Sequence, residues 1–183
     1  MRLLASERRR NALRAAGVTT VVRIPTVLAA AVLALVPAVA MAIPEVGKPP
    51  PPFSLPSPGG KPVALAGLRG QPLYVNFFAS WCAPCNAEAP AIGKLRGQYA
   101  KRGLRVLGID ELDRPGEAQA FQRKFANPYS LVAIDEDGAV GKKYGAIGMP
   151  VHVFIDRRGV VTTFRVGEMS AVEIETAIKD SLK

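Results

Sequence analysis

Short apolar runs alternate with longer amphipathic segments along the chain after residue 61. Runs of four to six mostly apolar residues predict strands, and apolar positions three or four residues apart predict helices. The predicted strands are 62–65, 73–78, 104–109, 131–134, 151–155 and 160–164. The predicted helices are 84–101, 117–125, 139–144 and 171–182. With a hairpin at 157–159, this order predicts an α/β domain whose mixed central sheet is flanked by helices.

The first 43 residues have a different pattern. Residues 24–43 are twenty consecutive uncharged, mostly apolar positions, which as a helix would be about 30 Å long, the thickness of a bilayer core. Several arginines precede this run, so the positive-inside rule predicts a cytoplasmic N-terminus and an exported domain. Ala40-Met41-Ala42 has the small-x-small form of a signal-peptidase site. Residues 1–43 are therefore predicted to be a cleaved signal peptide or an anchor in the inner membrane.

Residues 44–60 are rich in proline and glycine. Prolines at 49–52 favour an extended polyproline II conformation, because each ring fixes φ and removes a hydrogen-bond donor. Gly59-Gly60 follows as a turn signal. We expect 44–60 to be a stiff linker and 61–183 to be the folded domain.

The formal charge of +9 does not indicate nucleic-acid binding. The first 42 residues contain six arginines and the single acid Glu7, so the export segment carries much of this charge. Beyond it, cations alternate with acids, which is typical of a solvated surface rather than a phosphate-binding stripe. A length of 183 residues and a hydrophobic fraction of 49% suit one globular domain plus a short appendage.

The chain contains only two cysteines, Cys82 and Cys85, which can pair in an oxidising compartment. A disulfide across so small a loop would stabilise the fold by roughly 2 kcal/mol, against nearly 5 for a hundred-residue loop. Stabilisation of the fold therefore does not explain the cysteine pair well. A structural zinc site needs four ligands, and the only histidine is His152. The pair is therefore predicted to be redox-active, without a resident metal or cofactor.

The position of the cysteines supports redox chemistry. They directly follow the apolar run 73–78 and open the predicted helix 84–101. Unpaired N–H groups and the dipole of a helix N-terminus favour a thiolate, and Pro84 suits a first turn. We expect an exposed Cys82 of low pKa to attack and Cys85, one turn inward, to resolve.

Trp81-Cys82-Ala83-Pro84-Cys85 after an apolar strand resembles the active site of the thioredoxin superfamily. The resemblance extends over about 46–182 to the TlpA/ResA/CcmG (DsbE) branch of bacterial extracytoplasmic reductases. The other matching segments are Phe53-Ser54-Leu55, Leu68-Arg69-Gly70, 75–80, Glu88-Ala89-Pro90 and 148–156. The resemblance implies a thioredoxin-like fold and thiol–disulfide exchange.

The resemblance also assigns roles to residues outside the cysteine pair. Pro150 matches the family's cis-proline, so the backbone of Met149 would pair with a substrate strand, beside Trp81. Glu88 matches an acid near the cysteines that tunes thiol pKa or moves a proton, although an ordinary solvated helix glutamate is the alternative. Asn76 stands where thioredoxin has a buried aspartate.

The implied partners are disulfide-containing exported proteins, such as apocytochromes c or metal-site assembly proteins, and a membrane electron donor of the DsbD or CcdA type. The chain departs from the family after the cis-proline, where Val151-His152 replaces the usual threonine or Glu-Thr. The alternative function is a copper-binding assembly factor with Cys82, Cys85 and His152 as ligands. Such factors on this fold usually separate their cysteines by three residues.

Overall fold

The computed structural model describes residues 43–183. Its main sheet has five strands in the order β5-β4-β3-β6-β7. In chain order these are β3 (Leu73–Phe78), β4 (Arg105–Glu111), β5 (Leu131–Asp135), β6 (Val151–Ile155) and β7 (Val161–Val166). β3, β4 and β5 are parallel, whereas β6 is antiparallel to both β3 and β7. The predicted mixed sheet and thioredoxin-like architecture are confirmed.

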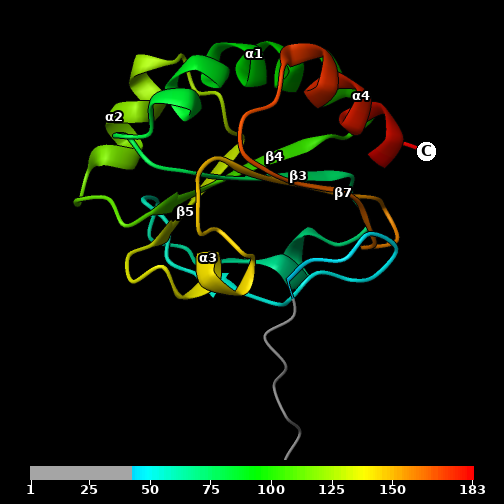
Figure 1. The fold of residues 1–183 in the computed structure, drawn as a ribbon, viewed down its shortest axis with the longest axis horizontal. Coiled ribbons are helices and arrows are strands. Elements are labelled where there is room, and N and C mark those ends of the chain that lie inside the picture. The colour runs from blue at the N-terminus through cyan, green and yellow to red at the C-terminus, as the bar shows by residue number, and fades with distance from the viewer. Residues whose placement is uncertain (1–42) are drawn as a thin grey trace, which may run out of the picture. The chain divides into compact units, whose positions relative to one another are not determined.

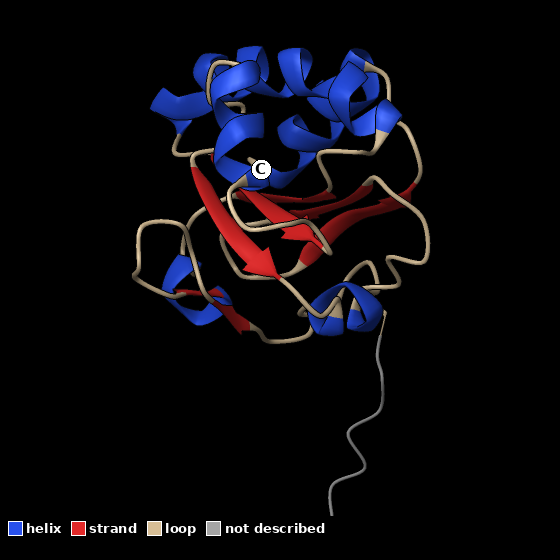
Figure 2. Ribbon diagram, turned by 90° about the vertical axis from the view of Figure 1, so that its left-hand side faces the viewer, coloured by secondary structure: helices blue, strands red, loops and turns tan. Residues whose placement is uncertain are grey.

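Helices cover both faces of the sheet (Figures 1 and 2). One face carries α1 (Ala83–Tyr99), α2 (Glu117–Lys124) and α4 (Ala171–Ser181), and the other carries α3 (Ala139–Lys143). The pair β1 (Ser54–Leu55) and β2 (Val63–Ala64) belongs to this second face. All six residues of β3 are buried, as expected for a central strand that contacts apolar side chains on both sides.

The predicted elements agree closely with the structure. β3 and β6 have the predicted bounds. The helices and the other strands of the main sheet differ from the prediction by one or two residues at one or both ends. The predicted strand at 62–65 is reduced to β2, because Leu65–Leu68 forms a 3₁₀ turn. α4 begins with a capping box in which Ser170 and Glu173 bond each other's backbone N–H groups.

The segment 44–60, predicted as a linker, contacts the domain at several points. Phe53 and Leu55 are buried in the core beneath the sheet, because their side chains are apolar. The Tyr144 hydroxyl donates to the Pro51 carbonyl, and Gly47 N–H donates to the Val161 carbonyl. The packed part of the chain therefore begins well before residue 61.

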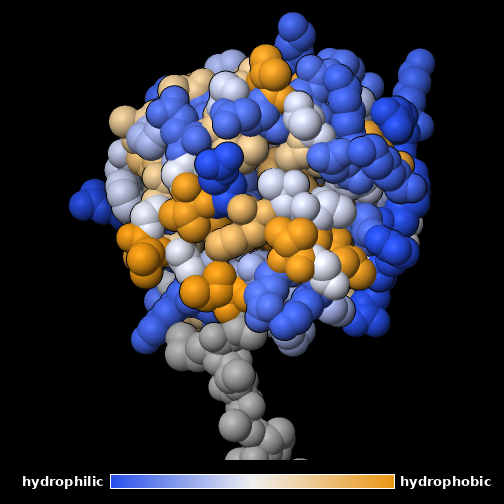
Figure 3. All heavy atoms as spheres, turned by 45° about the vertical axis from the view of Figure 1, so that its right-hand side comes forward, coloured by the Kyte–Doolittle hydropathy of each residue, from blue (hydrophilic) through white to orange (hydrophobic). Residues whose placement is uncertain are grey.

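The predicted signal peptide or anchor lies almost entirely outside the described residues. None of the helices within 43–183 combines the length and hydrophobicity that a membrane crossing requires. On the face shown in Figure 3, hydrophobic side chains gather in the lower half, and the right-hand side is mostly hydrophilic. Large exposed apolar side chains of the described chain include Ile43, Trp81, Ile147 and Val172.

Candidate active site

The two cysteines form a disulfide where β3 gives way to α1. Cys82 is the N-cap of α1, and its Sγ accepts a hydrogen bond from the Cys85 N–H at 3.2 Å. Pro84 lies in the first turn, where its missing N–H costs no helical hydrogen bond. The predicted strand, turn and helix around the cysteines are confirmed, and Cys82 stands at the positive end of the helix dipole.

The disulfide is more buried than the sequence indicates. Cys82 is 5% exposed and Cys85 is 1% exposed, so the prediction of an exposed Cys82 is wrong for this oxidised form. Both cysteines belong to the core cluster on the face of the sheet that carries α1, α2 and α4, where Ala79 and Phe78 are also buried. Trp81, in contrast, is 63% exposed and marks the surface next to the pair.

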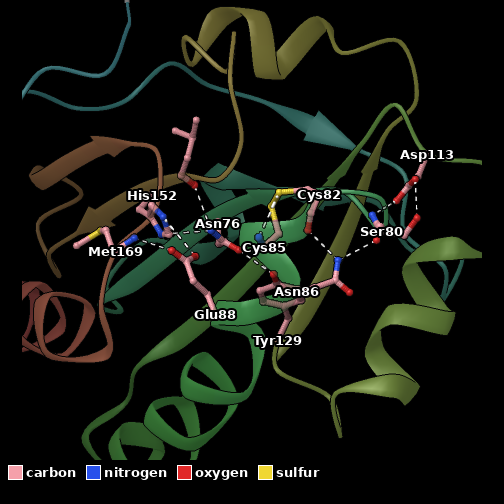
Figure 4. Close-up of a disulfide and its surroundings, with 11 residues drawn as sticks. Asn76, Ser80, Cys82, Cys85, Asn86, Glu88, Asp113, Tyr129, His152 and Met169 are labelled. Carbon is pink, nitrogen blue, oxygen red and sulfur yellow. Dashed lines mark hydrogen bonds and ion pairs between the residues drawn. A yellow bond between two sulfur atoms is a disulfide. The ribbon is translucent and has the colours of Figure 1, made fainter.

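A set of polar contacts holds the turn that carries Cys82. Asp113 accepts hydrogen bonds from the Ser80 backbone N–H at 2.6 Å and from its hydroxyl at 2.9 Å. Asn86 Nδ2 donates to the carbonyls of Ser80 and Cys82 (Figure 4). The sequence does not point to Asp113, which is 33 positions from Ser80 with no local pattern to link them. Asn86 lies only four positions after Cys82, but its residue type alone gives no signal of this role.

The cis-proline loop reaches the same end of the sheet. The Met149-Pro150 peptide bond is cis, and β6 begins directly after it with Val151 opposite Phe77 of β3. Gly167 N–H donates to the Pro150 carbonyl, which ties the loop to the end of β7. Met149 packs against the cluster that contains both cysteines. Met149 thus packs on the core cluster that contains the disulfide, and Pro150 follows it through the cis peptide bond, while their role in substrate binding stays a prediction.

Glu88 lies one helical turn after Cys85 on α1 and is 5% exposed. The alternative of a solvated helix glutamate is therefore wrong. Its Oε1 accepts the Met169 N–H at 2.6 Å, whereas Oε2 has no hydrogen-bond partner among the described residues. Burial raises the pKa of Glu88 to about 7, against the lowering effect of the Met169 hydrogen bond and with a further increase from Glu168.

Four buried polar side chains form a network behind the disulfide. Tyr129 donates from its hydroxyl to Asn76 Oδ1 at 2.7 Å, and Asn76 Nδ2 lies 3.3 Å from both the Val151 carbonyl and His152 Nδ1. The Tyr74 hydroxyl lies 2.8 Å from the same Nδ1. In Figure 4, Asn76 stands between His152 and the cysteines. The β3–β6 register creates this network by setting Asn76 opposite His152.

His152 is fully buried, and burial lowers its pKa to about 4, so it is neutral at pH 7. Its Nδ1 is occupied by Tyr74 and Asn76, and its Nε2 lies 3.6 Å from Glu88 Oε2. No group of three or more potential metal-ligating side chains occurs in the part of the chain that the structure describes. These contacts do not favour the copper-binding alternative.

Two acids, Asp110 and Asp113, lie beyond the turn. Asp110 is 2% exposed, and it pairs with Phe78, the last residue of β3. Burial, followed by a hydrogen bond with Asp113, raises the pKa of Asp110 to about 8. Asp110 therefore retains its proton at neutral pH, close to the turn that carries Cys82.

Comparison with known proteins agrees with this geometry. The model of the AhpC/TSA family matches residues 46–164. A thiol:disulfide interchange protein DsbE of Pseudomonas fluorescens biotype C is 40% identical over 128 residues, covering 69% of this chain and 70% of the relative. A thiol-disulfide oxidoreductase ResA of Bacillus thuringiensis subsp. konkukian is 31% identical over 138 residues, covering 74% and 78% respectively.

Solved structures give the same result. A thiol:disulfide interchange protein of the thioredoxin family from Chlorobium tepidum has a TM-score of 0.65 and 28% identity, with 76% of this chain and 99% of that chain covered. A secreted Mycobacterium tuberculosis disulfide oxidoreductase homologous to Escherichia coli DsbE has a TM-score of 0.63 and 27% identity, covering 69% and 94%.

Proposed function

The chain belongs to the AhpC/TSA family, and its relatives include the DsbE and ResA thiol–disulfide oxidoreductases. We therefore propose that it reduces disulfides of exported proteins through Cys82 and Cys85. The observation that carries this proposal is the position of Cys82 as the N-cap of α1, paired with a cysteine one turn inward. The helix N-terminus stabilises a Cys82 thiolate, which is the form that attacks.

In the first step the Cys82 thiolate attacks one sulfur of the substrate disulfide. A Cys82–substrate disulfide forms, the substrate S–S bond breaks, and the first substrate thiolate takes a proton from water. In the second step Cys85 loses its proton and attacks Cys82 Sγ. The Cys82–Cys85 bond forms, the Cys82–substrate disulfide bond breaks, and the second substrate thiolate leaves and takes a proton from water. The substrate gains two electrons and the enzyme ends oxidised.

The second step needs a base inside the protein, because Cys85 is only 1% exposed. Glu88 follows Cys85 by three positions on α1, so the two side chains lie on the same side of the helix. A carboxyl group with a pKa of about 7 can both accept and release a proton at neutral pH. We assign Glu88 as the group that takes the Cys85 proton.

Substrate would contact the surface around the disulfide. Exposed Trp81 offers an apolar platform, and the Met149-Pro150 loop offers a backbone edge to an extended substrate segment. These contacts suit an unfolded or flexible exported polypeptide, with apocytochromes c and metal-site assembly proteins as the proposed substrates.

Two further parts of the proposal concern the cellular setting. The apolar run 24–43 would export the domain to the periplasmic or extracytoplasmic side and, if uncleaved, anchor it to the inner membrane. There a membrane thiol transporter of the DsbD or CcdA type would return electrons to the Cys82–Cys85 disulfide.

Variants of the two cysteines test the mechanism. Cys85→Ser should accumulate a mixed disulfide with a disulfide-containing peptide, whereas Cys82→Ser should form none. Both variants should lose insulin reduction. Normal insulin reduction by both variants would refute the mechanism.

The direction of the reaction is tested by the reduction potential of the pair, measured by equilibration with glutathione. A reductase should have a potential near that of thioredoxin, about −270 mV. A value near that of the oxidant DsbA, about −120 mV, would reverse the assigned direction.

A further inference from the structure

Two buried polar atoms face each other without hydrogen-bond partners. Glu88 Oε2 and His152 Nε2 are 3.6 Å apart, and neither has a partner that meets hydrogen-bond geometry within 43–183. Both side chains are at most 5% exposed. Burying unpaired polar atoms costs free energy, so two such atoms pointing at each other indicate a contact used in another state of the site.

The surrounding network fixes which imidazole nitrogen carries the proton. Asn76 Oδ1 accepts from Tyr129, so Nδ2 is the side that faces the Val151 carbonyl and His152 Nδ1. An amide N–H₂ only donates, so Nδ1 must accept, and the Tyr74 hydroxyl can donate to it as well. Neutral His152 therefore carries its proton on Nε2, toward Glu88.

We propose that His152 is a positioning residue for Glu88: held in the Nε2–H tautomer by Tyr74 and Asn76, it presents a neutral donor to Glu88 Oε2 and stabilises the carboxylate that takes the Cys85 proton. This inference rests on the role proposed above for Glu88. His152 acts through Glu88 and does not touch the reacting sulfur atoms in this scheme.

The contact differs between the two forms of Glu88. When Glu88 is ionised, Nε2–H can donate to Oε2 as the atoms close to hydrogen-bond distance. When Glu88 is protonated, an Oε2–H directed at the ring would meet Nε2–H. The ring cannot easily move its proton to Nδ1, because the Asn76 amide hydrogen already points there. His152 therefore favours the ionised form.

The other groups around Glu88 and His152 do not stabilise the ionised form of Glu88 in this way. Glu168 disfavours an ionised Glu88, and Arg165 on β7 disfavours a charged His152. The Gly167 backbone raises the pKa of His152, against the larger lowering by burial. Tyr74 and Tyr129 remain neutral, because burial raises the pKa of each hydroxyl. Met169 N–H contacts only Oε1, so Oε2 depends on His152.

The experiment is a single-turnover reduction of a disulfide peptide by the reduced protein between pH 5.5 and 9, with release of the second thiol as the readout. In the wild type this rate should rise with pH through the Glu88 ionisation, near pH 7. His152→Leu removes the donor, so the profile should move about one pH unit to the alkaline side, with a several-fold loss of rate at pH 7. His152→Gln retains an N–H donor and should show a smaller shift.

Two controls separate the possible failures. Glu88→Gln should remove the ionisation from the profile, with or without His152→Leu. Val161→Ala, buried on the opposite face of the sheet, should lower stability and leave the profile unchanged. If Glu88→Gln flattens the profile but His152→Leu does not shift it, His152 has no positioning role and the proposed function stands. If Glu88→Gln leaves the profile intact, the role of Glu88 fails, and this inference fails with it.

A measurement on the wild type covers the case in which His152→Leu does not fold. ¹⁵N NMR of the imidazole should show a neutral ring with its proton on Nε2 between pH 6 and 8. The Nε2 signal should titrate with the midpoint of Glu88, and it should not titrate in Glu88→Gln. A proton on Nδ1 over this pH range would overturn the proposal.

Discussion

Asp113 accepts hydrogen bonds from both the backbone N–H and the hydroxyl of Ser80, two residues before Cys82. The bond to the N–H is 2.6 Å long, and the acceptor comes from the loop between β4 and α2. The orientation of the Cys82 turn thus depends on a residue from a different part of the chain.

Replacing Asp113 should loosen this turn. In Asp113→Ala the partly buried Ser80 N–H loses its acceptor, so the free energy of unfolding should fall by about 1 to 3 kcal/mol, measured by urea denaturation of the oxidised protein. Asp137→Ala is the matched control, because Asp137 accepts one N–H from Ala139 at an exposed site. An equal loss in both variants would contradict a special role for Asp113.

Gly108 on β4 makes room for the Tyr129 ring. A Cβ at position 108 would lie 2.5 Å from Tyr129 Cδ2. Gly108→Ala must therefore displace the Tyr129 ring and weaken the hydrogen bond from the Tyr129 hydroxyl to Asn76. We expect a loss of about 1 to 3 kcal/mol of stability in thermal or urea unfolding. Gly97→Ala in α1 meets nothing within 4 Å and should stabilise the protein by up to about 1 kcal/mol. A stable Gly108→Ala protein would show that Tyr129 repacks freely.

Trp81 should matter for substrate rather than for folding. Because its side chain is 63% exposed, Trp81→Ala should change the free energy of unfolding by about 0.5 kcal/mol or less. The KM for a protein disulfide should rise several-fold, since an exposed aromatic beside the reactive pair is lost. Val172→Ala, 72% exposed on α4, serves as the control and should leave KM unchanged. Equal KM values for the three proteins would exclude Trp81 as a substrate contact.

The buried acids should make the oxidised protein less stable as pH rises. The native pKa values of Glu88 and Asp110, about 7 and about 8, lie above their ordinary values of 4.5 and 3.8. The native state therefore retains protons that the unfolded chain releases, and the free energy of unfolding falls between about pH 4 and pH 8. After discounting for solvent screening, each acid should account for about 1 to 2 kcal/mol of this fall.

Urea unfolding at pH 5 and pH 8.5 checks this dependence. Glu88→Gln and Asp110→Asn should each make the fall smaller. Glu173→Gln should not, because hydrogen bonds from Ser170 lower the pKa of Glu173, so its contribution is lost only at more acid pH. A wild-type stability that is equal at both pH values would show that neither Glu88 nor Asp110 retains its proton.

Several features of the site could be predicted from neighbouring residues alone. The apolar run 73–78, the cysteines after it and Pro84 in the first turn specify a strand, a sharp turn and a helix N-terminus. These elements depend on backbone hydrogen bonds and side-chain periodicity within a few residues, so the local sequence contains the information. The motif around Cys82 also identified the fold and the chemistry.

The surroundings of the cysteines were decided by the tertiary structure. Asn76 meets His152 only through the β3–β6 register, and Tyr129 and Glu88 join them from separate elements. The sequence likewise predicted a stiff linker at 44–60, although Phe53 and Leu55 are buried in the core on the face of the sheet that carries α3. The sequence determined the attacking and resolving cysteines, because local chemistry defines them. Burial and pairing depend on residues distant in sequence, so only the folded sheet shows that Glu88 and His152 share one buried contact.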